Sequence, residues 1–117
     1  MMLRIDPGST VPLFEQLAAS VRAEASRGAL RSGERLPAAR DVAESLDINV
    51  HTVLRAYQLL REEGLVDLRR GRGATVTERV THYGELGDAI PRLVTAAKDL
   101  GLGIDTLTAM IRQEYNQ

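Results

Sequence analysis

The sequence predicts a mainly α-helical fold that carries one small β-hairpin, and three observations support this prediction. Apolar residues recur at helical spacing through most of the 117 residues. Between residues 65 and 77 the period changes, and two short β-prone runs flank the turn RRGRG. The composition, with 44% apolar and 26% charged residues, is that of an ordinary globular domain. We therefore expect one small protein with a core built mainly from Leu, Val, Ile and Ala.

Residue types that are rare or missing exclude several classes of function. The chain has no cysteine, which excludes disulfides, thiolate nucleophiles, thiolate zinc sites and iron–sulfur clusters. With one Phe, three Tyr and no Trp, stacking platforms for unpaired bases are scarce. No apolar run approaches the roughly 18 residues of a membrane span, and the first residues lack the apolar core of a signal peptide. A cytoplasmic protein is expected.

The net charge of −1 hides an uneven distribution of charge. Residues 1–79 hold 12 Arg against 11 acidic residues, a net of +1, whereas residues 80–117 hold 3 basic and 5 acidic residues, a net of −2. Lys98 is the only lysine. Because Arg suits bidentate contacts with phosphate and guanine, the first part of the chain is the better candidate for a polyanion partner.

The first helix is expected over residues 11–27. Its apolar positions follow helical spacing at Leu13, Leu17, Ala18 and Val21. Thr10 is a candidate N-cap, Pro12 stands at an early helical position and Gly28 is a natural stop. The stretch RSGERLP that follows is interpreted as a polar loop.

Two short helices follow, in AARDVAESLDI and NVHTVLRAYQLLREEG. The predicted core faces are Val42, Ala43 and Leu46 on one helix, and Val53, Leu54, Tyr57 and Leu60 on the next. Asn49 is well suited to cap the later helix and Gly64 to end it. Two short helices joined this tightly predict a helix-turn-helix.

The β-prone runs at residues 65–68 and 74–77 predict a hairpin. Its tip combines three Arg with two Gly, so its backbone can approach a surface closely while the cations reach outward.

The remaining residues return to helical patterning. A seam with spacings of 4, 3, 4 and 3 residues is formed by Leu86, Ile90, Leu93, Ala97 and Leu100, and it implies a partner surface. Gly101 and Gly103 break the seam, and Leu107, Met110 and Ile111 define a last helix. Pro91 either interrupts the first of these helices or marks its start.

Residues 33–76 resemble the winged-helix DNA-binding domain of the GntR family of bacterial transcription regulators. The family pattern is matched at Gly33, Leu36, Pro37, Arg40, Ala43, Leu46, Thr52, Val53, Glu63, Gly64, Leu65, Val66 and the hairpin glycines. The chain is most similar to the YtrA subfamily, because of NVHTVLRAY at residues 49–57 and because about 40 residues follow the hairpin. The resemblance implies a winged helix-turn-helix at residues 1–79 and a short helical dimerisation tail at residues 80–117.

A DNA major groove about 12 Å wide admits one helix, whose N-terminal residues reach the base edges. The predicted base readers are Asn49, His51 and Thr52, with Arg55 on phosphate. The resemblance adds Arg40, a position that binds DNA in GntR proteins, and a wing of Arg69, Arg70, Gly71, Arg72 and Gly73 along the backbone or in the minor groove. Val50 stands where many GntR members carry Arg, so base preference is not transferable.

Each assignment has a simpler alternative. Asn49 could be only an N-cap, His51 a solvated residue and the wing a soluble turn. Tyr57 is interpreted as packing, and residues 61–63 as a solvated face. A metal site at His82, Glu85 and Asp88 would rest on one His and two scattered carboxylates, so three solvated polar side chains are favoured and neither a metal nor a cofactor is expected.

The function predicted from these features is sequence-specific transcription regulation, with a homodimeric repressor bound to a two-fold operator of double-stranded DNA. The alternative is a winged-helix module that binds protein, or DNA without sequence preference. An enzyme is not expected, because two His, no Cys and no glycine-rich phosphate loop leave no catalytic constellation. The tail leaves room for an unidentified small-molecule effector between subunits, and no membrane partner is expected.

Overall fold

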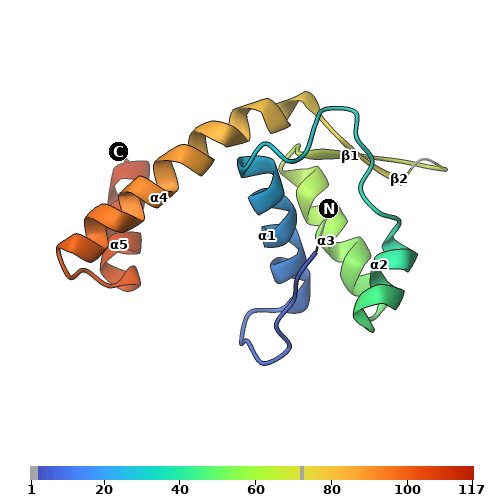
Figure 1. Ribbon diagram of the computed structural model, residues 1–117, viewed down its shortest axis with the longest axis horizontal. Helices are drawn as coiled ribbons and strands as arrows, with labels where there is room; N and C mark the ends of the chain where they lie inside the picture. The colour runs from blue at the N-terminus through green and yellow to red at the C-terminus, as the bar shows by residue number, and fades with distance from the viewer. Residues whose placement is uncertain (1–2, 72) are drawn as a thin grey trace.

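The computed structural model describes residues 3–71 and 73–117, and it confirms a mainly α-helical fold with one antiparallel hairpin (Figure 1). The elements are α1 (Leu13–Ser26), α2 (Ala39–Leu46), α3 (Val50–Glu62), β1 (Val66–Arg69), β2 (Gly73–Val76), the 3₁₀ helix η1 (Glu78–His82), α4 (Tyr83–Asp99) and α5 (Ile104–Tyr115). The hairpin and the α4–α5 pair lie at opposite ends of the 48 Å long axis.

One hydrophobic core holds the first three helices and the hairpin together. Helix α3 packs against α1, α2 and β1, and α1 also packs against α4. The most deeply buried side chains are those of Leu17, Leu60, Leu65, Val21, Val53 and Val76. They are all Leu or Val, as expected for a chain with so few aromatic residues.

The start of α1 differs from its prediction. Thr10 is not its N-cap: the helix begins at Leu13, Pro12 occupies the N-cap position, and no side chain caps it. The fixed φ of proline is compatible with this position, where φ is −55°, and the Pro12 carbonyl accepts from the amides of Glu15 and Gln16. Gly28 follows the end of the helix with a φ of +75°, in agreement with its predicted role as a stop.

A tight turn of three residues joins α2 to α3, which confirms the predicted helix-turn-helix. Asp47 ends α2 in the left-handed conformation, with a φ of 54°. Asn49 is the N-cap of α3, and its side-chain oxygen accepts a hydrogen bond from the His51 amide at 2.8 Å. The predicted capping role of Asn49 is therefore confirmed, and it fixes where α3 begins.

The predicted core face of α3 is wrong at one position. Val53, Tyr57 and Leu60 are buried, but Leu54 is 47% exposed. The core-facing stripe is completed by Ala56, which stands three residues after Val53, whereas Leu54 lies about 100° further round the helix than Val53.

The hairpin pairs Val66 with Val76 and Arg69 with Gly73. The stretch RSGERLP, expected to be a polar loop, also contributes to the sheet, because Arg35 forms an antiparallel bridge with Thr75. The Leu36 amide donates to the Ala74 carbonyl at 2.9 Å, and the Val76 amide donates to the Glu34 carbonyl at 2.8 Å. Strand β2 is therefore paired on both edges, which anchors the base of the hairpin.

The core continues past residue 79, where the predicted DNA-binding domain ends. Val80 of η1 is 5% exposed and belongs to the core cluster, and Tyr83 packs against it. A Cβ atom at Gly87 would overlap the carbonyl oxygen of Ser26 and lie 2.9 Å from its Cβ, so α4 crosses the end of α1 at a residue without a side chain. The start of the tail is thus part of the same packed unit.

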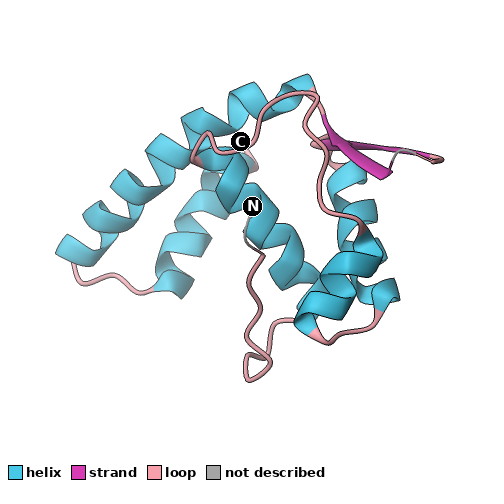
Figure 2. Cartoon of the chain, turned by 45° about the vertical axis from the view of Figure 1, so that its right-hand side comes forward, coloured by secondary structure: helices cyan, strands magenta, loops and turns pink. Residues whose placement is uncertain are grey.

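Pro91 lies inside α4, so it neither begins nor ends the helix. In both ribbon views α5 turns back beside the second half of α4 (Figure 2). Ala97 and Leu107 are buried there, outside the core cluster.

Candidate nucleic-acid interface

Helix α3 has one exposed face that runs along its length, opposite the core. We call it the reading face, and it consists of His51, Leu54, Arg55, Gln58 and Arg61. His51 and Arg55 were predicted site residues, whereas Leu54 was assigned to the core and Gln58 was not considered. The helical period counted from His51 would have found both, because residues three, four and seven positions apart share a face.

The first turn of α3 carries the predicted base readers. Asn49 and His51 are exposed, and Thr52 is half-buried. The Asn49 side-chain oxygen is engaged in the cap, so its amide nitrogen remains as a donor. A hollow beside this turn is lined by Leu13, Phe14, Asn49, His51, Thr52 and Arg55, which brings the start of α1 next to the start of α3.

Arg55 is held in place by an aromatic ring. Its guanidinium carbon lies 3.8 Å from the centroid of the Phe14 ring. Stacking uses the face of the guanidinium and leaves its in-plane N–H donors available for an acceptor such as phosphate. Phe14 was not considered as a site residue, because a lone aromatic on an amphipathic helix is usually a core residue.

Arg40 is exposed at the second position of α2. Within the described residues its side chain has no hydrogen bond or ion pair. The N-cap residue of α2, Ala38, provides no side-chain hydrogen bond, so the first amides of the helix are uncapped by a side chain. Cationic Arg40 therefore stands beside the positive end of a helix dipole, a combination that suits an anionic partner.

The wing, defined here as residues 66–76, carries its cations near the tip. Arg69 donates through Nε to Oδ2 of Asp67 at 2.9 Å, and both side chains are exposed, so this pair adds little stability. Arg70 is exposed, and Gly71 and Gly73 have φ values of +80° and +69° that favour glycine. Arg72, the third predicted wing cation, lies outside the described residues.

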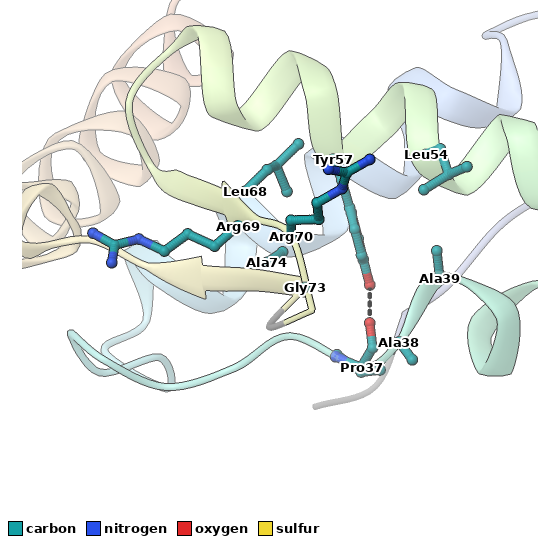
Figure 3. A pocket seen from close by; sticks show the side chains of 10 residues that line it. All are labelled: Pro37, Ala38, Ala39, Leu54, Tyr57, Leu68, Arg69, Arg70, Gly73 and Ala74. Atoms are coloured by element: carbon teal, nitrogen blue, oxygen red, sulfur yellow. Dashed lines mark hydrogen bonds between the residues drawn. The ribbon is translucent and has the colours of Figure 1, made fainter.

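Figure 3 shows the hollow between the wing, α3 and the start of α2. Tyr57 closes one wall, and its hydroxyl donates to the Pro37 carbonyl at 2.6 Å. Burial raises the pKa of Tyr57 to about 12, so the phenol stays protonated and keeps this bond. The interpretation of Tyr57 as a packing residue is confirmed, and it ties α3 to the segment that precedes α2.

At the other end of α3, Glu63 joins three helices. Arg22 of α1 donates through Nε to Oε1 of Glu63 at 2.8 Å, and the Tyr83 hydroxyl of α4 donates to Oε2 at 2.5 Å. Burial raises the pKa of Tyr83 to about 12, and the hydrogen bond to Glu63 and its negative charge act in the same direction. Glu63 was predicted to lie on a solvated face, which is wrong, whereas Arg61 and Glu62 are exposed as expected.

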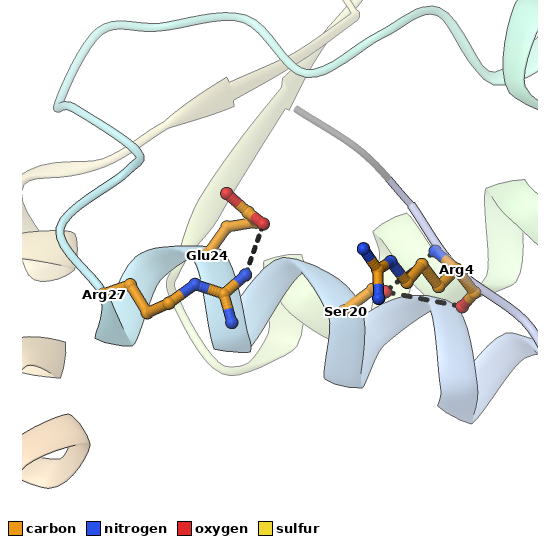
Figure 4. Close-up of polar contacts among 4 residues, drawn as sticks. All are labelled: Arg4, Ser20, Glu24 and Arg27. Carbon is orange, nitrogen blue, oxygen red and sulfur yellow. Dashed lines mark hydrogen bonds and ion pairs between the residues drawn. The ribbon is translucent and has the colours of Figure 1, made fainter.

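A second group of basic residues, along α1, is engaged within the chain. The Arg4 amide donates to Oγ of Ser20 at 3.0 Å, and Arg27 forms an ion pair with Glu24 at 2.5 Å (Figure 4). Within residues 3–71 and 73–117, no three side chains of His, Asp or Glu are grouped to hold a metal ion. In the same part of the chain no helix is long and apolar enough to cross a membrane.

A helix-turn-helix, an exposed polar and cationic face on its second helix, and an Arg-containing hairpin beside that face define a DNA-binding transcription regulator of the winged-helix class. The family model for the gntR family of bacterial regulatory proteins matches residues 4–76. The chain therefore belongs to the gntR family, as its sequence pattern predicts.

Individual relatives agree with this assignment. The HTH-type transcriptional repressor YtrA of Bacillus subtilis is 35% identical over 77 residues, which are 66% of this chain and 59% of YtrA. The HTH-type transcriptional regulator Rv1152 of Mycobacterium tuberculosis is 35% identical over 100 residues, 86% of this chain and 83% of the relative. These relatives are transcription regulators and not enzymes, in agreement with the expectation for this chain.

Solved structures agree with the fold. The structure of YtrA from Sulfolobus acidocaldarius, a GntR-family transcription factor, has a TM-score of 0.62 and 29% identity, over 81% of this chain and 99% of that chain. A GntR family transcriptional regulator from Listeria monocytogenes has a TM-score of 0.66 at 23% identity, over 93% of this chain and 98% of that chain.

Proposed function

We propose that this protein is a sequence-specific transcription repressor that binds a two-fold DNA operator as a homodimer. The observation that carries the proposal is the placement of three features around α3. The predicted base readers lie at its start, and Arg55 is stacked on Phe14 beside them. The wing and the start of α2, the helix that carries Arg40, share a hollow with Leu54 of α3. A helix in the major groove with a wing on the adjoining backbone would use all of them.

The proposed roles follow the chemistry of each side chain. Asn49, His51 and Thr52 offer hydrogen-bonding groups to base edges, and they would select the sequence. Arg40, Arg55 and Arg70 offer cations to phosphates, and they would supply affinity for any sequence. Asn49 would then have two roles. Its side-chain oxygen caps the N-terminus of α3, and its side-chain amide nitrogen would donate a hydrogen bond to DNA.

The tail supports the proposed dimer. Four of its five predicted seam residues are exposed large apolar side chains: Leu86, Ile90, Leu93 and Leu100. The fifth, Ala97, is already buried within the single chain and has little surface left to contribute. A second copy that covers the exposed four would place two α3 helices about one DNA turn apart, roughly 34 Å, or a multiple of that distance.

We also propose that the DNA-binding and dimerisation parts of the chain meet at residue 79. Residues 1–79 would bind DNA and residues 80–117 would pair the subunits, although Val80 and Tyr83 pack with the first part. An effector would bind between subunits, where the short tail leaves room for a small molecule.

Selection of bound DNA from a random library, with the full chain, tests the proposal directly. We expect enrichment of a two-fold site whose half-sites are separated by one or two helical turns. Equal retention of all sequences would refute sequence-specific binding and favour the architectural alternative. With the enriched site placed over a promoter, reporter transcription is expected to fall when the protein is supplied. A rise would refute the repressor assignment.

A further inference from the structure

Leu54 is the apolar member of the reading face. It is exposed one turn after His51, and its side chain lines the hollow between α3, the wing and the start of α2 (Figure 3). The hollow has a volume of about 310 Å³. Its apolar lining includes Ala38, Ala39 and Leu68.

The exposure of Leu54 is not explained by folding. The core-facing positions of α3 are filled by Val53, Ala56, Tyr57 and Leu60, and Leu54 is absent from the core cluster and from the side chains that pack against it. An exposed Leu on a polar helix face leaves apolar surface in water, where it contributes little to stability. Its position beside the base readers suggests that this surface is covered when the protein binds its partner.

The surroundings of Leu54 indicate what that partner is. Arg69 and Arg70 line the same hollow, although Arg69 is paired with Asp67 and its guanidinium points away from Leu54 (Figure 3). Arg55 follows Leu54 in the chain. An apolar side chain with Arg70 beside the same hollow and Arg55 next in the chain fits a polyanion that carries an apolar group where its bases are read. In the major groove that group is the C5-methyl of thymine, which an apolar side chain can contact.

We propose that Leu54 is a specificity-determining residue that contacts a thymine methyl group in each half-site. This inference rests on the proposed function, because it requires α3 to lie in the major groove. Leu54 then adds an apolar contact to the hydrogen bonds offered by Asn49 and His51, and it disfavours a cytosine or a purine at its position.

Deoxyuridine substitution gives a direct test, because it removes the thymine methyl and keeps base pairing and every groove hydrogen-bonding group. Each thymine of the selected operator is replaced in turn, in both half-sites together, and affinity is measured with the intact protein. We expect one position at which affinity falls about fourfold per half-site, the equivalent of about 0.8 kcal/mol for one buried methyl group. Leu54→Ala is expected to bind thymine and uracil equally well at that position.

Two further variants serve as controls. Leu54→Met keeps an apolar side chain of similar size, so it should retain the preference for thymine. Gln58 lies one turn after Leu54 on the same face. The Gln58→Ala variant should keep the preference for thymine, even if its overall affinity for the operator changes. Thermal unfolding of each variant confirms that the fold is intact, and the exposure of both positions predicts that it will be.

The possible outcomes separate the two proposals. If no sequence is enriched from the library, the proposed function fails. If an operator is enriched and bound tightly but tolerates uracil everywhere, the role of Leu54 is refuted while the function stands. The role is also refuted if Leu54→Ala keeps the full preference for thymine, or if the operator contains no thymine within reach of α3.

Discussion

The part of the chain built around α1, α2, α3 and the wing differs from the end of the tail in how each covers its apolar side chains. In the first part most large aliphatic residues of the helices pack into one core, and Leu54 is the one on α1 to α3 whose side chain is exposed. The tail, made of α4, α5 and the short loop between them, exposes several large apolar side chains: Leu86, Ile90, Leu93, Leu100, Ile104, Met110 and Ile111. The first part therefore buries its apolar side chains within the single chain. The tail leaves an exposed apolar surface of the kind that is expected at a subunit interface.

The largest change in stability is expected when Leu is replaced by Ala in the core, and the same replacement in the tail gives the comparison. Leu60 is 0% exposed and Leu100 is 76% exposed. Leu60→Ala should lower the free energy of unfolding by about 2–5 kcal/mol, because it leaves a cavity in the core. Leu100→Ala should change it by less than about 0.5 kcal/mol in the monomer. Denaturant unfolding at low protein concentration measures both, and equal losses would erase the contrast between the two regions.

The next effect concerns association. Leu93 is half-way along the exposed seam of α4, and Leu93→Asp would place a charge in the proposed interface. We expect the dimer dissociation constant to rise at least about 100-fold, the equivalent of about 2.7 kcal/mol, with unchanged helix content. Sedimentation of the variant beside the intact protein provides the measurement. A variant that remains dimeric at the same micromolar concentration would contradict the proposed role of this seam.

The next substitution is expected to change the affinity for DNA and to leave dimer formation unchanged. Arg40→Ala is expected to weaken operator binding by about 1–3 kcal/mol, with the fold and the oligomeric state unchanged, because the side chain is exposed. Arg112→Ala in α5 is the matched control, since it removes an exposed Arg from the other region. Binding titrations at a fixed salt concentration compare the two. Equal losses would indicate a general charge effect and not a contact.

The smallest effect is expected at the junction between the two regions. Tyr83→Phe removes the hydrogen bond to Glu63 and should cost about 1–2 kcal/mol of stability. The pKa of Tyr83 is raised from 10.0 to about 12 by folding, so the stability that it contributes is fully present below pH 10 and is lost as the pH rises through 12.

The pH dependence provides the control for this substitution. The difference in unfolding free energy between the intact protein and Tyr83→Phe should be constant near neutral pH and should shrink between pH 10 and 12. A difference that grows with pH over this range would show that the neutral phenol is not the form that folding favours.

Signals local to the sequence predicted most of the fold. The spacing of apolar residues predicted the helices, and Asn49 and Gly64 marked the ends of α3, because caps depend only on neighbouring residues. The hairpin was predicted from its β-prone runs and glycines. Pairing of residues 33–36 with β2 was not predicted, because a short polar stretch carries no strand signal of its own.

The candidate site was predicted less completely, for a different reason. His51 and Arg55 were predicted as site residues because they lie on a recognisable motif, and the structure shows that both are exposed on α3. Leu54 was assigned to the core because it follows Val53 directly. An apolar pattern alone does not show which of two adjacent apolar residues faces the core. Glu63 was missed because its partners, Arg22 and Tyr83, are 41 and 20 residues away in the chain. Contacts of this kind depend on the tertiary packing and cannot be inferred from spacing.

Pro91 has a mechanical consequence for the shape of α4. Proline has no backbone N–H, so the carbonyl of Gly87, four residues earlier, lacks its usual partner within the helix. Gly87 is also the residue at which α4 crosses the end of α1. Helix α4 therefore lacks one backbone hydrogen bond just after the turn that packs against α1 and just before the half that carries Leu93. We expect α4 to bend most easily at this point, and in the proposed dimer such bending would let the two subunits adapt to small differences in half-site spacing.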